Sequence, residues 1–276
     1  MTSALRLAVQ RCCSPISSLL VHYTWSERRG GHYSPYLFRA DLSGTFSKAI
    51  VTDNRGIGML KAVLFDLDGT LVDSEPLHTE AVLRLLRDRS VDLKASDLDR
   101  FIGISSSVMW GEMRERFGFA EPVESLKSLQ HRANVEMLED SESILIPGVL
   151  PLLRDLRDRG IRSAVASSST RDYIETVLSK YELDSLFDVV VSGEEVPRGK
   201  PRPDVFLRAA ELLGVEPGSC VVIEDSDNGL TAAREAGIRS IGFRNPNSGR
   251  QALSLADRIV DDIREVSVAL LQRLVD

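Results

Sequence analysis

The sequence is poor in cysteine, histidine and aromatic residues, and it has no long hydrophobic run. Three cysteines in 276 residues do not support a disulfide framework, and four histidines without a Cys/His cluster argue against zinc. No segment reaches the roughly 18 uninterrupted apolar residues that a membrane span requires. We therefore expect a soluble protein with no membrane partner.

Positive charge is also in deficit, with 34 basic residues against 41 acidic ones and a net charge of −7. This balance disfavours a nucleic-acid-binding surface, although a local cationic pocket for a phosphate would not show in the total. Apolar residues make up 43% of the chain and charged residues 27%, which is typical of globular proteins. The length is sufficient for one large domain or two modest ones.

The first 58 residues differ in composition from the rest. They are rich in Arg and Ser, poor in acids and without sustained periodicity. We predict a poorly ordered leader over residues 1–58, which is either a non-native start upstream of Met59 or an organellar transit peptide. The expected location is the cytoplasm, or an organelle if the leader is a transit peptide.

From Met59 onward, short apolar runs alternate with amphipathic helical patterns. Strands are predicted at 60–65, 162–166, 187–191, 219–223 and 238–242, and helices at 148–159, 171–181, 203–213 and 227–236. The alternation predicts an α/β fold with a parallel sheet covered on both faces. The active site of such a sheet lies at the carboxyl ends of its strands.

Residues 75–145 interrupt this alternation, because they contain helical patterns but no convincing strand. The helices are predicted at 77–89, 106–117 and 123–140. An insertion of this kind predicts an all-helical cap over the strand tips. We assign residues 59–73 and 147–276 to the catalytic core and residues 74–146 to the cap domain.

Acidic residues follow two of the predicted strands directly. Asp66 and Asp68, one residue apart, end the first apolar run, and Glu224 and Asp225 end the run at 219–223. Carboxylates beside a buried strand are costly unless a cation compensates them, and oxygen ligands from two strands suit Mg²⁺. The alternative for Asp66 and Asp68 is an exposed Asp-Gly-Thr turn, and the alternative for Glu224 and Asp225 is helix capping.

Two further segments carry groups suited to phosphate. Ser167 follows the strand at 162–166, and the backbone amides of Ser168 and Ser169 could cradle an anion there. Lys200 lies on a loop stiffened by two prolines, although a lone Lys beside Pro is also common in solvated turns.

Taken in order, these motifs resemble the haloacid dehalogenase superfamily: Asp66-Leu67-Asp68-Gly69-Thr70, then Ser167, Lys200 and Glu224-Asp225. The resemblance implies a Rossmann-like core with an inserted helical cap. It implies that Asp66 is the nucleophile, Asp68 the general acid/base, and Ser167 and Lys200 the phosphate-orienting pair. Asp66, Asp68, Glu224 and Asp225 are the implied Mg²⁺ ligands.

Within the superfamily, Asp73-Ser74-Glu75-Pro76-Leu77-His78 and Gly199-Lys200-Pro201 are similar to the beta-phosphoglucomutase and sugar-phosphatase group. Thr70, His78, Ser168 and Ser169 are the candidate substrate-binding residues. The mutases carry a Ser-Arg pair after Gly103-Ile104, whereas this chain has Ser105-Ser106-Ser107, which removes a bidentate phosphate clamp.

These observations predict a Mg²⁺-dependent phosphatase that hydrolyses a small phosphorylated metabolite, such as a sugar phosphate, through a phosphoaspartate. The alternatives are a beta-phosphoglucomutase-like isomerase and a non-catalytic phosphate-binding protein on the same fold. We expect a monomer.

Overall fold

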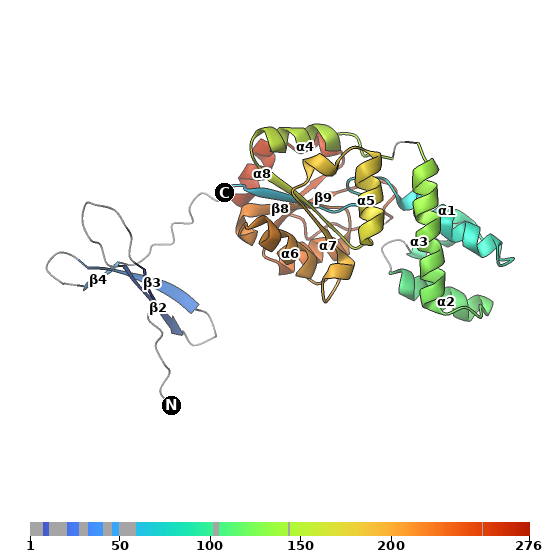
Figure 1. Ribbon diagram of the computed structural model, residues 1–276, viewed down its shortest axis with the longest axis horizontal. Coiled ribbons are helices and arrows are strands. Elements are labelled where there is room, and N and C mark those ends of the chain that lie inside the picture. Colours follow the sequence, from blue (N-terminus) through green and yellow to red (C-terminus); the bar gives the residue numbers. More distant parts are fainter. Residues whose placement is uncertain are drawn as a thin grey trace, which may run out of the picture. The chain divides into compact units, whose positions relative to one another are not determined.

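The structure is a computed structural model that describes residues 59–276 apart from 102–104, 143 and 250, and the backbone of four strands nearer the N-terminus (Figure 1). These strands, β1 (Ala8–Gln10), β2 (Val21–Glu27), β3 (Tyr33–Ala40) and β4 (Phe46–Ala49), form an antiparallel sheet in that order. The rest of the predicted leader, residues 1–58, lies outside the described residues. Its interpretation as a poorly ordered non-native start or transit peptide stays a prediction.

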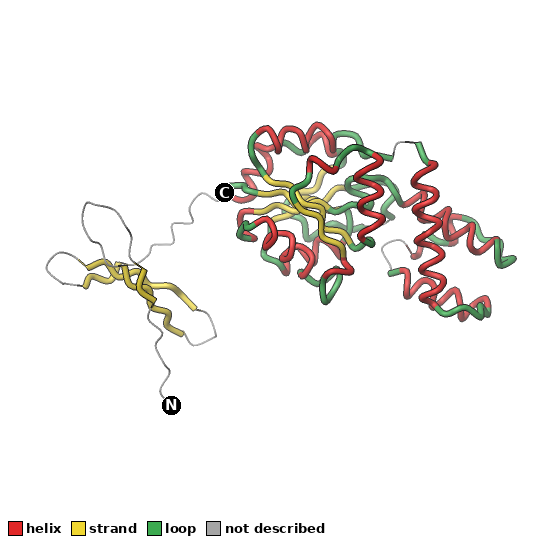
Figure 2. The backbone as a smooth tube through the Cα atoms, viewed as in Figure 1, coloured by secondary structure: helices red, strands yellow, loops and turns green. Residues whose placement is uncertain are grey.

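A six-stranded parallel sheet forms the centre of the second unit, Gly58–Asp276, in the order β10-β9-β8-β5-β6-β7 (Figure 2). Its strands are β5 (Ala62–Phe65), β6 (Arg162–Ser167), β7 (Val189–Ser192), β8 (Cys220–Glu224), β9 (Arg239–Phe243) and β10 (Arg258–Val260). Phe65, the last residue of β5, pairs with Val165 on one side and Ile223 on the other, so the carboxyl ends of the three strands lie at the same edge of the sheet. The predicted parallel α/β sheet is confirmed, and β10 is a strand that the sequence pattern did not predict.

Helices cover both faces of this sheet (Figure 1). On one face lie α4 (Val149–Asp158), α5 (Arg171–Lys180) and α8 (Val268–Val275), and on the other lie α6 (Asp204–Leu213) and α7 (Asp227–Glu235). Successive side chains of β5 alternate between the two faces, as strand geometry requires: Val63 packs with the first group and Leu64 with the second. Burial on both faces explains why the strand is a continuous apolar run.

The inserted segment forms a helical cap with its own apolar core. It contains the α-helices α1 (Glu75–Arg87), α2 (Ser106–Phe117) and α3 (Val123–Asp140). Two short 3₁₀ helices, η1 (Ala95–Asp97) and η2 (Asp99–Phe101), lie between α1 and α2. Trp110 is fully buried in this core, and its indole N–H donates a 2.7 Å hydrogen bond to Oε1 of Gln130. The predicted helical cap is confirmed, whereas the assigned boundaries at residues 74 and 146 stay predictions.

The core helix α5 holds the cap helix α3 at two places. Nζ of Lys180 donates to the carbonyl oxygens of Leu138, Glu139 and Ser141, which lie at the C-terminal end of α3. A lysine is well suited to this position, since the last carbonyl groups of a helix have no partner within it and carry partial negative charge. Farther along α3, Nε2 of His131 lies 2.7 Å from Oδ2 of Asp172.

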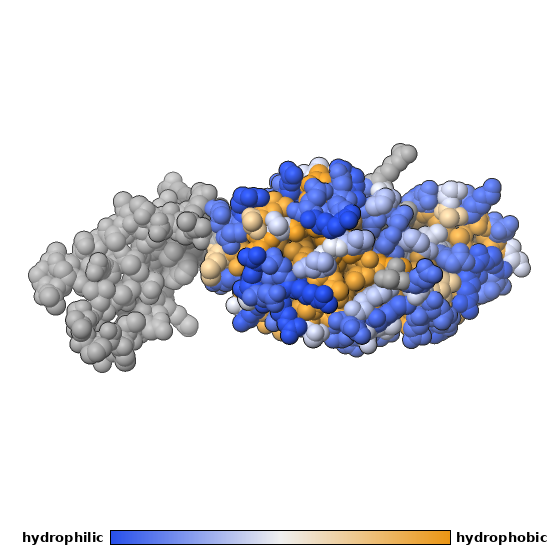
Figure 3. Space-filling view, turned by 90° about the horizontal axis from the view of Figure 1, so that it is seen from above, coloured by the Kyte–Doolittle hydropathy of each residue, from blue (hydrophilic) through white to orange (hydrophobic). Residues whose placement is uncertain are grey.

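The surface is mixed, with hydrophilic residues over much of the face in Figure 3 and apolar residues between them. The large apolar side chains that are exposed in the described part of the chain are Met59, Val108, Leu207 and Leu212. Within the same residues, no helix is both long enough and apolar enough to span a bilayer.

Candidate active site

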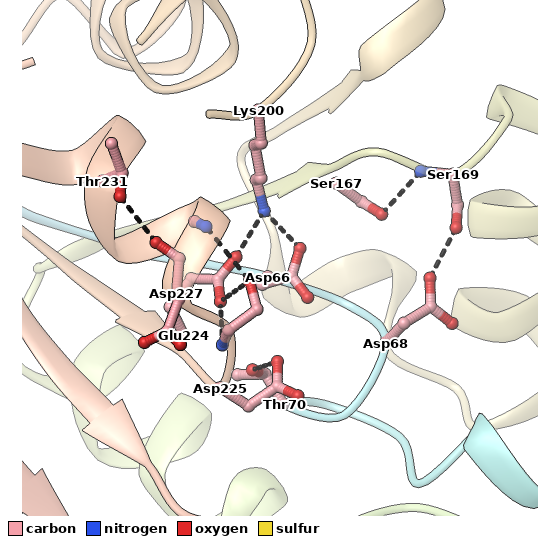
Figure 4. A network of polar contacts seen from close by, with 12 residues as sticks. Asp66, Asp68, Thr70, Ser167, Ser169, Lys200, Glu224, Asp225, Asp227 and Thr231 are labelled. Atoms are coloured by element: carbon pink, nitrogen blue, oxygen red, sulfur yellow. Dashed lines mark hydrogen bonds and ion pairs between the residues drawn. The ribbon is translucent and has the colours of Figure 1, made fainter. Parts of the chain in front are cut away.

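The carboxyl end of β5 presents a buried carboxylate to a buried ammonium group. Asp66 continues the sheet pairing beyond the strand, since its N–H donates a 3.0 Å hydrogen bond to the carbonyl of Ile223. Its side chain forms an ion pair with Nζ of Lys200, which also donates a 2.8 Å hydrogen bond to Oε1 of Glu224 (Figure 4). The Lys200 side chain is only 5% exposed, so this cation is desolvated against two carboxylates.

The end of β8 brings two more carboxylates to the same place. Oε2 of Glu224 accepts hydrogen bonds from the N–H (2.7 Å) and the hydroxyl (2.9 Å) of Ser226, and Oδ1 of Asp225 accepts one of 3.1 Å from Thr70. One carboxylate oxygen from each of Asp66, Glu224 and Asp225 can be chosen so that all three lie within 4.8 Å of one another. The predicted convergence of β5 and β8 therefore occurs.

Two glycines make room for these carboxylates. A Cβ on Gly69, whose φ is +78°, would lie 2.1 Å from Oδ2 of Asp225, and a Cβ on Gly229 would lie 1.6 Å from Oε1 of Glu224. Any side chain at either position would displace an acidic group. The backbone around the cluster is thus shaped to hold carboxylates.

Burial makes the charged forms of these acids costly. It raises the pKa of Asp66 to about 7, against the opposing effect of the Lys200 charge. Burial, with the charges of Glu224 and Asp66, raises the pKa of Asp225 well above its usual value. Burial lowers the pKa of Lys200, but the charges of Asp66 and Glu224 more than reverse this effect, so the group stays protonated.

These residues fit a divalent metal ion of the Mg²⁺ type. The donors are all carboxylate oxygens, which hard cations prefer, and they come from separate strands around a shared position. Three buried acids face one lysine, and a cation at this position would stabilise the ionised forms that burial makes costly. The carboxylate of Asp68 is not part of this group.

Asp68 faces the cap linker instead. Its Oδ1 accepts a 2.6 Å hydrogen bond from the hydroxyl of Ser74 and lies 3.6 Å from Nε2 of His78. Its Oδ2 accepts a hydrogen bond from the hydroxyl of Ser169 (Figure 4). The second aspartate of the motif therefore has a different environment from the first, with protein donors on both oxygens.

The predicted serines lie at the end of β6, beside Asp68. The N–H of Ser169 donates a 3.0 Å hydrogen bond to Oγ of Ser167, which is buried, and this contact closes a tight turn before α5. A cavity of about 530 Å³ opens above the strand ends, and Ser167, Ser168 and Ser169 all line it. The same cavity is lined by the other predicted site residues Asp66, Asp68, His78, Lys200, Glu224 and Asp225. Thr70, predicted to bind substrate, is fully buried and does not line it; its hydroxyl donates to Asp225 instead.

The cap contributes a polar wall to this cavity. Ser105, Ser106 and Ser107 line it where the mutase pattern has an arginine, and Lys127 of α3 also lines it. Nζ of Lys127 forms a 3.0 Å ion pair with Glu124. No arginine is among the described residues that line this cavity.

Two residues that support the site were not singled out from the sequence. Ser74 is fully buried and orients Asp68, and Tyr173 has its hydroxyl 3.3 Å from Nε2 of His78. A third, Asn245, lies in the loop after β9, where the sequence suggested a residue that could contact substrate; it donates a 3.0 Å hydrogen bond to the carbonyl of Gly69. Ser74 belongs to the motif after β5. Tyr173 lies inside an amphipathic helix, where its position predicted only core packing.

Comparison with known proteins agrees with this geometry. The haloacid dehalogenase-like hydrolase family model matches residues 63–243. Validoxylamine A 7'-phosphate phosphatase of Streptomyces hygroscopicus subsp. limoneus is 33% identical over 75% of this chain and 96% of its own, and hexitol phosphatase B of Escherichia coli K12 is 34% identical over 68% and 85%.

Among solved structures, beta-phosphoglucomutase from Clostridium difficile superposes with a TM-score of 0.67 at 25% identity, over 79% of this chain and 97% of that one. The phosphatase relatives support a phosphoric monoester hydrolase, and a phosphomutase is consistent with the structural match. With its sheet, its cap and its cluster of acids at the strand ends, the chain belongs to the haloacid dehalogenase-like hydrolases, in the group that unites beta-phosphoglucomutases and sugar phosphatases.

Proposed function

We propose that the protein is a Mg²⁺-dependent phosphatase that hydrolyses a small phosphorylated metabolite, such as a sugar phosphate, through a phosphoaspartate on Asp66. The observation that carries the proposal is the buried Asp66 carboxylate, which lies at the floor of the cavity between Lys200 and the acids of β8. Phosphatases named for validoxylamine A 7'-phosphate and for hexitols are among the relatives, and the second name supports a polyhydroxylated substrate.

The first step is attack of an Asp66 carboxylate oxygen on phosphorus. A new O–P bond forms, the bond from phosphorus to the substrate oxygen breaks, and the leaving alcohol takes its proton from Asp68. In the second step water attacks the phosphoaspartate, Asp68 takes the proton of that water, and inorganic phosphate leaves. Asp66 is regenerated as a carboxylate.

The remaining predicted residues have supporting roles in this scheme. Lys200, Ser167 and the amide of Ser168 orient the transferring phosphoryl group and offset its charge. The amide of Ser169 holds the Ser167 hydroxyl in place instead, through its 3.0 Å hydrogen bond to Oγ. His78 positions Asp68, from which it is 3.6 Å away. Thr70 orients Asp225 through its 3.1 Å hydrogen bond.

Asp66, Asp225, Glu224 and the backbone carbonyl of Asp68 would hold Mg²⁺. When bound, the ion supplies positive charge that offsets repulsion between a phosphate dianion and the Asp66 carboxylate. Glu224 already has both oxygens engaged by Lys200 and Ser226, so it contributes mainly by holding Lys200 in place.

Hydrolysis is favoured over the mutase reaction by the cavity wall. A mutase must bind the distal phosphate of a bisphosphorylated sugar, and the serines at 105–107 offer no bidentate cation for that task.

We further propose that residues 59–73 and 147–276 act as the catalytic core, with residues 74–146 as a cap that excludes bulk water. A cytoplasmic monomer is the proposed form, with an organelle as the alternative location.

The test is phosphate release from a panel of sugar and polyol monophosphates in the presence and absence of Mg²⁺. Release that depends on Mg²⁺ and is lost in Asp66→Asn supports the proposal. Conversion of beta-glucose 1-phosphate without phosphate release supports the mutase instead. Neither release nor conversion, together with no Mg²⁺ binding by calorimetry, favours the non-catalytic binding protein.

A further inference from the structure

One carboxylate in the wall of the catalytic cavity has no place in the proposed reaction. Glu75 is the first residue of the cap helix α1, and it lines the cavity above the strand ends together with Asp68 and His78. The proposed attack, proton transfer and metal binding use none of its atoms. Glu75 is therefore an acid of the site whose purpose the reaction chemistry leaves unexplained.

The carboxylate of Glu75 is available to a ligand. Among the described residues it makes neither a hydrogen bond nor an ion pair, whereas Asp68 has protein donors on both oxygens. Glu75 is half-buried, and its oxygens are not closed off from the cavity, because the buried side-chain polar atom without a partner in the described part of the chain belongs to Asn134. A molecule in the cavity can therefore reach the Glu75 oxygens.

Glu75 also lies near the group that serves the leaving alcohol. Glu75 and His78 are three residues apart on α1 and hence neighbours on one face, and Nε2 of His78 is 3.6 Å from Oδ1 of Asp68. Burial raises the pKa of Glu75; the charge of His78 opposes this rise, and those of Asp68 and Asp73 add to it. The carbon atoms attached to an oxygen beside Asp68 therefore lie on the side of Glu75.

We propose that Glu75 is a specificity-determining residue that accepts hydrogen bonds from substrate hydroxyl groups next to the phosphate ester and rejects substrates with an anionic group there. This inference rests on the proposed function, because it assigns the leaving group of the same reaction. An ionised carboxylate accepts several hydrogen bonds and donates none, which suits a polyol. A substrate carboxylate in that place would face the like charges of Glu75 and Asp68 together.

Two cations of α3 confine this rejection to the neighbourhood of Glu75. Lys127 lines the same cavity and pairs with Glu124 at 3.0 Å. Arg132, which is exposed and has no ion pair in the described residues, lines an adjoining cavity of about 550 Å³ between α3 and the core helix α5. An anionic group on a distant part of a long substrate can reach them. The experiment therefore uses three-carbon substrates, in which the second group stays close to the phosphate.

The primary test compares glycerol 3-phosphate with 3-phosphoglycerate, which has a carboxylate in place of the terminal hydroxymethyl group. In wild type we expect kcat/KM to be about tenfold or more higher for glycerol 3-phosphate. In Glu75→Gln this preference should fall about fivefold or more, because the amide removes the charge that repels the carboxylate. An unchanged preference in Glu75→Gln, or a wild type that prefers 3-phosphoglycerate because the cations of α3 dominate, would overturn the inference.

Hydrogen bonding has a separate readout in propyl phosphate, which has the same carbon chain and no hydroxyl group. Glu75→Ala should raise KM for glycerol 3-phosphate about tenfold with kcat within about threefold, because a hydrogen bond present in both ground state and transition state contributes to binding. For propyl phosphate kcat/KM should change by less than about twofold. Equal losses for both substrates would show that Glu75 acts on the reacting groups or on His78, and would overturn the inference.

A matched control and a stability measurement separate this role from a structural one. Glu80→Gln makes the same change at an exposed residue of α1 outside both cavities, and it should alter neither KM nor the substrate preference. The melting temperature of Glu75→Gln should stay within about 2 °C of wild type. A larger loss together with an unchanged preference would show that the carboxylate serves the start of α1 instead.

A calorimetric titration distinguishes failure of the inference from failure of the proposed function. Glycerol 3-phosphate and 3-phosphoglycerate are titrated into Asp66→Asn and into Asp66→Asn/Glu75→Gln, where no turnover is needed. Tighter binding of glycerol 3-phosphate by the first variant, with a smaller difference between the compounds in the second, supports the role of Glu75 even if wild type releases no phosphate. The same difference in both variants, or no binding of either compound, overturns the inference.

Discussion

The hydroxyl of Ser74 donates a 2.6 Å hydrogen bond to Oδ1 of Asp68, so the residue that precedes the first cap helix orients the proposed acid/base of the core. Ser74 is fully buried and lies directly before α1. This contact, together with His78 of α1 at 3.6 Å from the same oxygen, links the position of the cap to the orientation of the Asp68 carboxylate.

Ser74→Ala removes a hydrogen bond to a carboxylate and should lower kcat roughly tenfold to a hundredfold with little change in KM. The cause is a misdirected Asp68, so a leaving group that needs no proton should be less affected. Initial rates with a sugar phosphate and with 4-nitrophenyl phosphate measure the difference. The control is Thr176→Ala, which removes a hydroxyl on α5 that bonds only to the carbonyl of Asp172. A wild-type kcat in Ser74→Ala would contradict the prediction.

Asp66→Asn should lower phosphate release by roughly a thousandfold or more, because an amide cannot form the phosphoaspartate. Folding should be retained, since the variant also removes a buried charge. Phosphate assay and circular dichroism provide the two readouts. The control is Asp261→Asn, which should behave as wild type because Asp261 pairs with Arg244 on the surface. Substantial phosphate release by Asp66→Asn would exclude Asp66 as the nucleophile.

Asp225→Asn should stabilise the protein in EDTA, and by more at high pH than at low pH. The folded pKa of Asp225 is raised, so the folded state holds its proton where the unfolded state has lost it. Relative to the Asn variant, wild type therefore loses stability as pH rises above the ordinary pKa of an aspartate, by at most about 1.4 kcal/mol per pH unit.

Urea unfolding of both proteins at about pH 5 and about pH 8 measures this difference. In Mg²⁺ the order should reverse, because wild type gains binding free energy that the variant lacks. A stability difference in EDTA that is independent of pH, or that shrinks as pH rises, would contradict the assigned shift.

Cys220 should resist thiol reagents in the folded protein. Its side chain lies in the buried strand β8, and burial raises its pKa to about 12, so almost no thiolate exists near neutral pH. Labelling with Ellman's reagent in a Cys12→Ser/Cys13→Ser variant isolates this thiol. One equivalent should react only after unfolding in guanidinium, and rapid labelling of the native protein would be the opposite result.

Much of this architecture was accessible from the sequence because its signals are local. An apolar run that ends in acids marks a buried strand with a site at its tip, and this pattern identified both Asp66 and Asp225. The helices α2 and α3 occupy the predicted residues 106–117 and 123–140. The short edge strand β10 and the helix α8 lack such clear signals and were not predicted.

The sequence alone determined which residues supply carboxylates, lysine and serines, and that they follow strands of one parallel sheet, because strand ends meet at one edge whatever the loops do. Only the tertiary structure decided which partners these side chains have. Lys200 contacts both Asp66 and Glu224, Asp68 accepts a hydrogen bond from Ser74, and the buried side-chain oxygen of Asn134 has no donor among the described residues. Hydrogen bonds depend on distances of a few tenths of an ångström between segments far apart in the chain, and no local pattern encodes those distances.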